Sequence, residues 1–191
     1  MGHWSDINNT DIHELGTLDS LVKSVSGNVF IDVGCFIGGF TAVMAREAKK
    51  RGGQVYSIDL FKDSHEPLDW WKEHATFDIK NLFIHNMEQI GVIDTIKVIS
   101  GVSWETAGQF KNNSVDFVFI DADHHYESVK KDILAWYPKV KEGGIISGHD
   151  FNINAPLVAE RDVQKAVEEI FTDFKVENRI WWLRKPEGND G

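Results

Sequence analysis

Several residue types that mark specialised protein classes are scarce in this sequence. The 191 residues include one cysteine, Cys35, which excludes a disulfide framework and is typical of a protein of the reducing cytosol. No apolar run approaches the length of about 18 residues that a membrane span needs. We therefore expect a cytoplasmic protein with neither a membrane span nor a secretory leader.

Basic residues are also outnumbered. Twenty Lys and Arg residues stand against 30 Asp and Glu residues, which gives a formal net charge of -10. Nucleic acids and anionic membranes attract basic patches, so we expect neither as a partner. The length and the lack of a Pro/Gly-rich linker favour one domain over 1–191, with an N-terminal helical segment at 1–27 and a flexible tail at 186–191. A homodimer is left open.

Segments typical of buried strands alternate with segments of helical periodicity. The predicted strands lie at 29–33, 54–58, 96–100, 115–120 and 145–147. A helix capped by Thr17 and ended by Gly27 is expected before the first strand. Residues 174–176 and 180–183 predict a closing antiparallel hairpin. Repeated strand–helix units favour an α/β fold, in which helices cover both faces of a doubly wound parallel sheet.

Two of the predicted strands end at acids and histidines. The fourth strand is followed by Asp121 and, three residues later, His124; the fifth is followed by His149 and Asp150. Ligands of an open parallel sheet bind beyond the carboxyl ends of its strands, where these groups can hold a metal, a cation or a proton. The pattern therefore predicts a reaction site. The alternative is that His124 or His125 caps the helix that follows.

A glycine-containing turn joins the first strand to its helix. The turn starts at Asp32 and carries Gly34 and Gly38, which permit a tight bend and a close approach of backbone N–H groups to a ligand. Phe36 stands where a dinucleotide fingerprint has glycine, which weakens a pyrophosphate interpretation. Asp59 ends the second strand at a spacing that suits a ribose-binding acid. Together these features predict nucleoside binding; a simple turn and a capping Asp are the alternative.

These motifs resemble those of the class I S-adenosylmethionine-dependent methyltransferases over nearly the whole chain. Asp32-x-Gly34-x-x-x-Gly38 is similar to the first motif of that family and Asp59 to its ribose-binding acid. The segment 100–104 resembles the motif after the third strand, which borders the adenine. The layout is closest to the small, often metal-dependent O-methyltransferases that act on catechols, caffeoyl thioesters and macrolide sugars.

The resemblance implies a Rossmann-like, mostly parallel seven-stranded sheet with an antiparallel last strand. It also implies S-adenosyl-L-methionine as the cofactor. The residues expected to contact that cofactor are Asp32, Gly34, Phe36, Gly38, Asp59, Leu60, Gly101, Val102, Ser103, Trp104 and Asp121.

The acceptor end of the site departs from the family pattern. Relatives carry Asp-x-x-(Lys or His) after the fourth strand and an acid pair after the fifth, where this chain has His149 and Asp150. The resemblance implies Asp121 and Asp150 as ligands of Mg²⁺ or Mn²⁺, with His149 or Asn152 as a possible third ligand. Because of the departure, metal dependence is left open. His124 is expected to be the general base, and His149 is the alternative.

The activity predicted from these features is O-methylation of a small hydroxylated acceptor, of the sugar or natural-product type, by in-line displacement. Trp70 and Trp71 follow the second strand and either contact the acceptor or simply pack. One rival is an NAD-dependent oxidoreductase, favoured by the spacing of Tyr126 and Lys130 and disfavoured by Phe36. The other rival is a non-catalytic nucleoside-binding module that regulates a partner.

Overall fold

The chain forms an open seven-stranded sheet, and the computed structural model describes residues 11–61, 78–151 and 158–188. The strands are β1 (Val29–Val33), β2 (Gln54–Asp59), β3 (Ile96–Ser100), β4 (Val115–Ile120), β5 (Val140–Gly148), β6 (Lys175–Glu177) and β7 (Ile180–Arg184). Their order is β3-β2-β1-β4-β5-β7-β6. Strands β1 to β5 are parallel, and β7 is antiparallel to both of its neighbours. The predicted Rossmann-like sheet with an antiparallel last strand is confirmed.

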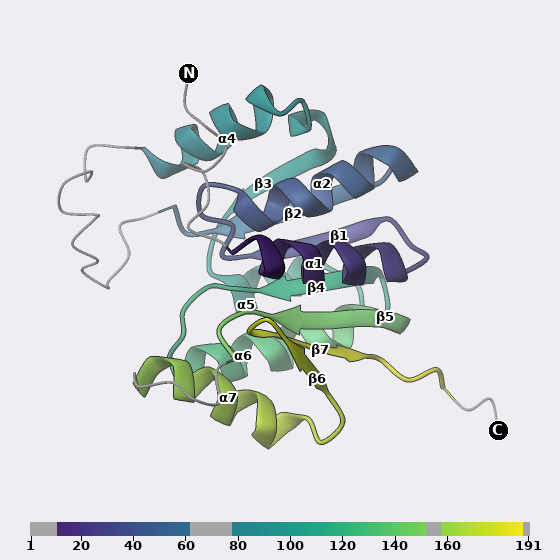
Figure 1. The fold of residues 1–191 in the computed structure, drawn as a ribbon, viewed down its shortest axis with the longest axis vertical. Helices are drawn as coiled ribbons and strands as arrows, with labels where there is room; N and C mark the ends of the chain where they lie inside the picture. Colours follow the sequence, from purple (N-terminus) through teal and green to yellow (C-terminus); the bar gives the residue numbers. More distant parts are fainter. Residues whose placement is uncertain (1–10, 62–77, 152–157, 189–191) are drawn as a thin grey trace.

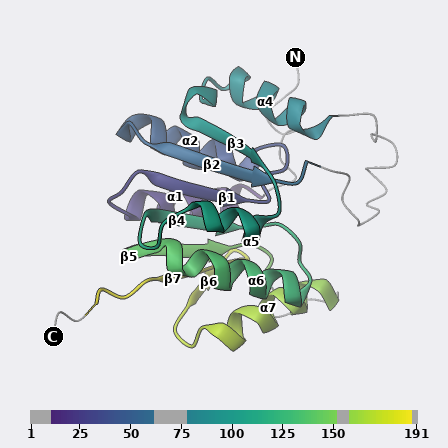
Figure 2. The same ribbon diagram turned by 180° about the vertical axis from the view of Figure 1, so that it is seen from behind.

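Helices cover both faces of this sheet (Figures 1 and 2). One face carries α1 (Ile12–Ser24), α2 (Gly39–Arg51) and α4 (Ile79–Gln89), and the other carries α5 (Ser103–Thr106), α6 (Tyr126–Trp136) and α7 (Val158–Ile170). Short 3₁₀ turns lie at Ile93–Thr95, Ala107–Gln109 and Tyr137–Lys139. Within the described ranges, no helix combines the length and the apolar character that crossing a bilayer requires.

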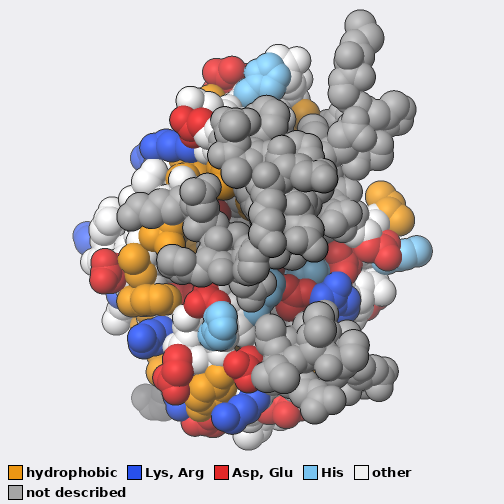
Figure 3. All heavy atoms as spheres, turned by 90° about the vertical axis from the view of Figure 1, so that its left-hand side faces the viewer, with side chains coloured by type: hydrophobic (Ala, Val, Ile, Leu, Met, Phe, Trp, Pro, Cys, Tyr) orange, Lys and Arg blue, Asp and Glu red, His pale blue; other side chains and the backbone are white. Residues whose placement is uncertain are grey.

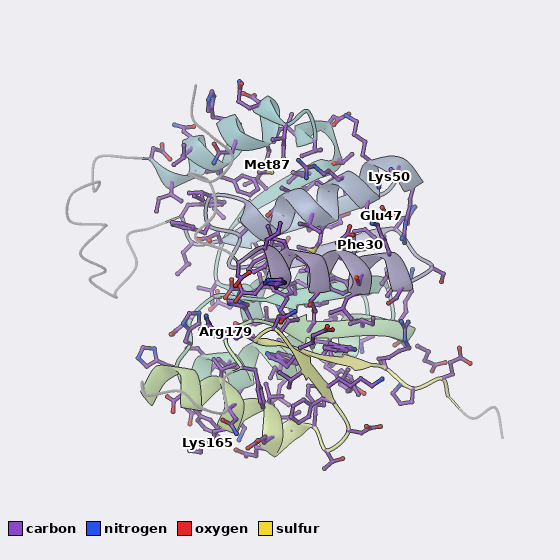
Figure 4. The ribbon with its side chains drawn as sticks, viewed as in Figure 1. Phe30, Glu47, Lys50, Met87, Lys165 and Arg179 are labelled. Carbon is purple, nitrogen blue, oxygen red and sulfur yellow. The ribbon has the colours of Figure 1, made fainter. Side chains whose placement is uncertain are left out.

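Strand β4 joins the two apolar layers, and all six of its residues are buried. Side chains of a strand alternate between the faces of the sheet. Phe117 and Phe119 accordingly pack in the cluster that contains Phe30, whereas Val118 packs in the cluster that contains Trp136. Figure 4 shows Phe30 and Met87 in the layer of α2 and α4. Burial on both faces explains why this strand is apolar at nearly every position.

The order of the strands determines where ligands can bind. From β1 the chain builds outward to β2 and β3 on one side, and then to β4 and β5 on the other. The crevice beyond the carboxyl ends of β1 and β4 is therefore the topological switch point, where open α/β sheets bind their ligands. These carboxyl ends lie on the left in Figure 1.

The first helix differs from its prediction. It begins at Ile12, and Thr17 lies inside it instead of capping it. Asp11 is the N-cap: its Oδ1 accepts a hydrogen bond from the His13 N–H at 2.8 Å, and Glu14 Oε2 accepts one from the Asp11 N–H at 3.2 Å. This reciprocal pair is a capping box, which satisfies two free backbone donors where a single threonine would satisfy one. Strand β5 is also longer than predicted, because it starts at Val140.

The antiparallel hairpin predicted over residues 174–183 is confirmed as β6 and β7. Glu177 pairs with Ile180, so Asn178 and Arg179 alone form the turn. Both have positive φ angles, 48° and 62°, as a type I′ turn requires. The Asn178 side chain donates a hydrogen bond to Thr17 Oγ1 at 3.0 Å, which docks this turn on the first half of α1.

A buried carboxylate near the amino ends of the parallel strands is expected to stabilise the fold. Asp116 accepts hydrogen bonds from the N–H groups of Asn28 and Val29 and from Lys141 Nζ at 2.7–3.0 Å. Asp116→Ala should lower the free energy of unfolding by about 1–3 kcal/mol, because it leaves backbone donors unsatisfied. Asp94→Ala, which removes an exposed ion pair with Lys49, should cost at most about 1 kcal/mol. Equal losses in urea melts would contradict this assignment.

Candidate active site

The turn between β1 and α2 packs closely against the segment that follows β4. Gly34 has φ 82°, and a Cβ atom there would lie 2.1 Å from the carbonyl oxygen of Asp121. Gly38 has φ 99°, and a Cβ atom there would lie 2.4 Å from Met87 Cε. Both positions therefore require glycine, as the sequence predicts. Phe36 adopts φ 47° within the same turn, and 36% of its surface is exposed.

Two carboxylates lie beside this turn. Asp59, at the end of β2, accepts hydrogen bonds from the N–H groups of Phe36 at 2.9 Å and Phe61 at 2.8 Å. Asp32, in β1, accepts one from the Thr41 hydroxyl through Oδ2. Burial raises the pKa of Asp32 to about 7, and the nearby charges of Asp121 and Asp59 add to this effect.

The second oxygen of Asp32 provides a test of whether the cofactor fits. This atom, Oδ1, is buried and has no hydrogen-bond partner among the described residues. Buried acceptors are nearly always paired, so an unpaired one beside a crevice indicates a missing donor. S-adenosylmethionine carries an ammonium group and two ribose hydroxyls, all of which are donors. The turn, the two carboxylates and the unpaired oxygen therefore fit this cofactor.

The segment after β3 is anchored to α6. Gly101 donates its N–H to the Asp59 carbonyl at 3.0 Å, which brings this segment next to the end of β2. Ser103 Oγ accepts a hydrogen bond from Trp136 Nε1 at 2.9 Å, and Lys131 Nζ lies 5.1 Å from the centroid of the Trp104 ring. The Ser103 hydroxyl and the Trp104 ring are thus both in contact with α6. Leu60 is 48% exposed beside Asp59.

The carboxyl ends of β4 and β5 bring three ligand-type side chains together. His124 Nε2 lies 3.0 Å from Asp150 Oδ2 and 3.6 Å from Asp121 Oδ1. One ligand atom from each of the three residues lies within 4.8 Å of the others, which matches a small metal site. Acidic and His side chains are visible on this face of the molecule (Figure 3). The structure thus brings together the acids and the histidine that the sequence places at two strand ends.

His149 lies on the other side of Asp150. Its Nδ1 is 3.3 Å from Asp150 Oδ1 and 3.7 Å from Asp121 Oδ1, and its ring centroid is 5.2 Å from that of Phe40. Its Nε2 is 3.2 Å from Glu14 Oε1, within ion-pair range but without the alignment of a hydrogen bond. His149 is therefore surrounded by three carboxylates.

Sequence reasoning missed two charged residues that contact Asp150 and His149. Glu14 comes from the first turn of α1, and Arg179 comes from the β6–β7 turn. Arg179 donates to Asp150 Oδ1 and has a second nitrogen 3.8 Å from Glu14 Oε1. A capping-box pattern at Asp11 and Glu14 could have located the helix start, but nothing local in the sequence indicates that either residue reaches the site.

The electrostatics of the cluster favour charged histidines. Burial alone would lower the pKa of His124, but its hydrogen bonds to Asp121 and Asp150 outweigh burial and raise the pKa to about 10. For His149 burial again opposes the charge, and Asp150 and Glu14 outweigh it, so the pKa is again about 10. Burial also opposes the charge of Asp150, yet the two histidines hold its pKa well below the usual range.

The structure also places the other residues that the sequence singled out near the site. His125 occupies the N-cap position of α6 but makes no side-chain cap hydrogen bond. Asp123 supports the start of the helix, because it accepts hydrogen bonds from the His125 N–H at 3.1 Å and from the Ser128 hydroxyl at 2.7 Å. Tyr126 and Lys130 contact each other at 3.0 Å, and both contact Glu169, so they join α6 to α7. Asn152, Trp70 and Trp71 lie outside the described residues.

A family model described as a methyltransferase domain matches residues 31–151, which contain both strand ends and the glycine turn. The chain belongs to the class I S-adenosylmethionine-dependent methyltransferases. S-adenosylmethionine is accordingly its cofactor, and the nicotinamide-linked alternative is excluded. The pair formed by Tyr126 and Lys130 connects two helices in this methyltransferase.

Solved structures share the fold at low sequence identity. The O-methyltransferase NovP is 17% identical with a TM-score of 0.68, over 92% of this chain and 81% of its own. TomG from Streptomyces achromogenes, an O-methyltransferase of tomaymycin synthesis solved with the cofactor, is 13% identical with a TM-score of 0.64, over 92% and 81%. CalS11, a TDP-rhamnose 3'-O-methyltransferase, is 13% identical with a TM-score of 0.63, over 93% and 81%. At these identities, the likeness establishes the fold.

The raised pKa of His149 predicts a pH-dependent contribution to stability. A histidine whose pKa rises from 6.5 to about 10 on folding stabilises the protein fully below pH 6.5, and this contribution is lost as the pH rises toward 10. The destabilisation caused by His149→Gln should therefore be largest near pH 6 and shrink toward pH 10 in denaturant melts with chelator. Ile133→Val, a non-titrating core change, should show a loss that does not vary in this way. A pH-independent effect of His149→Gln would contradict the assignment.

Proposed function

We propose that this methyltransferase transfers its methyl group to the hydroxyl oxygen of a small acceptor of the sugar or natural-product type. The observation that carries the proposal is the cluster of Asp121, His124 and Asp150 beside the glycine turn. Such a cluster can bind and deprotonate a hydroxyl group, which a purely nucleoside-binding module would not need. The shared fold with NovP and CalS11, both described as O-methyltransferases, supports the same reading.

On the cofactor side, Asp59 is proposed to accept the two ribose hydroxyls, the segment 100–104 to border the adenine, and Leu60 to contact the cofactor. Asp59 already holds the turn through the Phe36 N–H, so binding and turn geometry depend on one carboxylate. Asp32 would receive a donor of the cofactor at Oδ1, its unpaired oxygen. When bound, S-adenosylmethionine supplies a methyl group on a sulfonium, which becomes a neutral thioether as the new O–CH₃ bond forms.

On the acceptor side, Asp121 and Asp150 are proposed to hold a divalent cation, Mg²⁺ or Mn²⁺. Their carboxylate oxygens are hard ligands that suit these ions. A bound ion would supply Lewis acidity, which lowers the pKa of a hydroxyl group. His124 Nε2 lies within the same 4.8 Å cluster, so this nitrogen either completes the ligand set or stays free to move a proton.

His124 is the proposed base, and it can act as one only when its imidazole is neutral. With a pKa of about 10 it already carries a proton near neutral pH, so it cannot accept another. Neutralising the charges of Asp121 and Asp150 would remove the interactions that raise this pKa. The neutral imidazole would then accept the proton of the acceptor hydroxyl at Nε2. His149 is the second candidate base, next to the same two carboxylates.

Asp59→Ala tests the cofactor side. The loss of charge-assisted hydrogen bonds should weaken S-adenosylhomocysteine binding by about 1.5–3 kcal/mol for each bond removed, measured by calorimetry. Asp19→Ala, which removes an exposed carboxylate of α1, serves as the control and should leave the affinity unchanged. Wild-type affinity in a folded Asp59→Ala variant would overturn the ribose assignment.

His124→Ala tests the acceptor side. A panel of catechols, phenols, glycosides and nucleotide sugars would be screened for S-adenosylhomocysteine release and for the methylated product by mass spectrometry. With the best acceptor, His124→Ala should lower turnover by about 10²- to 10⁴-fold while cofactor affinity stays the same. His125→Ala is the matched control, because this adjacent exposed imidazole contacts Asp123 instead.

Chelation separates the two forms of the mechanism. EDTA should abolish turnover, and added Mg²⁺ or Mn²⁺ should restore it. Turnover that resists EDTA, together with a larger loss in His149→Ala than in His124→Ala, would replace this proposal with a metal-free site that uses His149 as the base. Failure to methylate any oxygen acceptor in the panel, with intact cofactor binding, would contradict O-methylation itself.

A further inference from the structure

The turn between β6 and β7 carries a residue that its backbone conformation disfavours. Arg179 is the second residue of a two-residue type I′ turn and has φ 62°. Glycine is favoured at this position because a side chain is strained at positive φ, and Asn-Gly is the usual pair in such turns. This chain has Asn178 followed by arginine. Strained residues of this kind cluster at functional sites.

The strained position directs the guanidinium group into the acceptor site. Arg179 donates to Asp150 Oδ1, and its other terminal nitrogen lies 3.8 Å from Glu14 Oε1. Its carbonyl oxygen accepts a hydrogen bond from the Phe151 N–H at 3.0 Å, so the backbone of the turn is also tied to the end of β5. Figure 4 shows Arg179 on the left of the molecule, where the parallel strands end.

The contact with Arg179 gives the two carboxylate oxygens of Asp150 different partners. Oδ1 is taken by Arg179 and faces His149 Nδ1 at 3.3 Å, while Oδ2 lies 3.0 Å from His124 Nε2. A carboxylate held at one oxygen cannot rotate freely, so its other oxygen keeps a defined direction. Groups outside the reacting cluster often orient its members in this way. Asp150 itself has φ 58°, so it too needs support in a conformation that few residues adopt.

We propose that Arg179 is a positioning residue for acceptor activation: it holds Asp150 so that Oδ2 faces His124. The inference rests on the proposed role of Asp150 at the acceptor end. Glu14 supports the other side of the guanidinium, which links the first turn of α1 to the same geometry. The role is the same whether Oδ2 contacts a cation or the imidazole, because in both cases its direction decides the contact.

Arg179→Gly is the decisive variant, because glycine suits the turn while the guanidinium is lost. Turnover should fall by about 10- to 100-fold, the usual effect of removing a group that orients a ligand, while S-adenosylhomocysteine affinity stays within about twofold. Millimolar guanidinium chloride should restore part of the turnover, which a purely structural defect would not allow. Arg179→Lys, which keeps the charge without the planar fork, should show an intermediate loss.

Asn178→Gly is the matched control. It changes the neighbouring residue of the same turn and removes the hydrogen bond to Thr17, but leaves Arg179 in place. Its turnover should stay close to that of the wild type and should not respond to guanidinium. Equal losses in the two glycine variants would show that the turn acts only as a structural support, and would overturn the inference.

Crystal structures of Arg179→Gly and the wild type give a readout that needs no acceptor. In the variant, Asp150 Oδ2 should move away from its position 3.0 Å from His124 Nε2. An unmoved carboxylate would refute the positioning role even if turnover fell. Failure of the proposed function appears differently, as a wild-type protein that binds the cofactor and methylates no acceptor.

Discussion

The close contact between the glycine turn and the end of β4 is the constraint on which the site depends. A Cβ atom at Gly34 would lie 2.1 Å from the Asp121 carbonyl, so only glycine allows the two chain segments to meet. On one side of this contact lie Asp32 and Asp59, which face the cofactor in the proposed function. Asp121, which forms this contact, belongs with His124 and Asp150 to the cluster proposed to bind the acceptor. In-line displacement requires the two reactants within about 3–3.5 Å, and this contact sets how near their binding groups can come.

The acceptor cluster is a balanced set of opposite charges. Glu14, Asp121 and Asp150 supply the acids, and His124, His149 and Arg179 supply the basic groups. Partly buried carboxylates are costly unless they are paired, and the raised pKa values of the histidines are the result of that pairing. The same pairing keeps the histidines protonated, and a protonated histidine cannot act as a general base. In the proposed mechanism, the charges of Asp121 and Asp150 are therefore neutralised before His124 accepts a proton.

Much of the fold could be predicted because its signals are local. The strands at 29–33, 96–100 and 115–120 have the predicted bounds, since a buried parallel strand is a short apolar run between turns. The start of α1 was predicted wrongly, because Thr17 has the right chemistry for a cap and the stronger capping box lies further toward the N-terminus. Asp121, His124 and Asp150 could be placed at one edge because parallel strands end on the same side.

The sequence by itself determined the α/β alternation, the glycine turn and the acids at the strand ends, all of which follow from neighbouring residues. Only the tertiary structure decided which other charges reach those acids. Glu14 and Arg179 lie near opposite ends of the chain, and they meet because α1 packs beside the antiparallel hairpin. Their contacts depend on the geometry of a complete sheet, and the protonation of His124 depends on its hydrogen bonds to Asp121 and Asp150, which outweigh its burial. Neither these contacts nor this protonation state has a local sequence signal, because both arise from distances that exist only after the chain has folded.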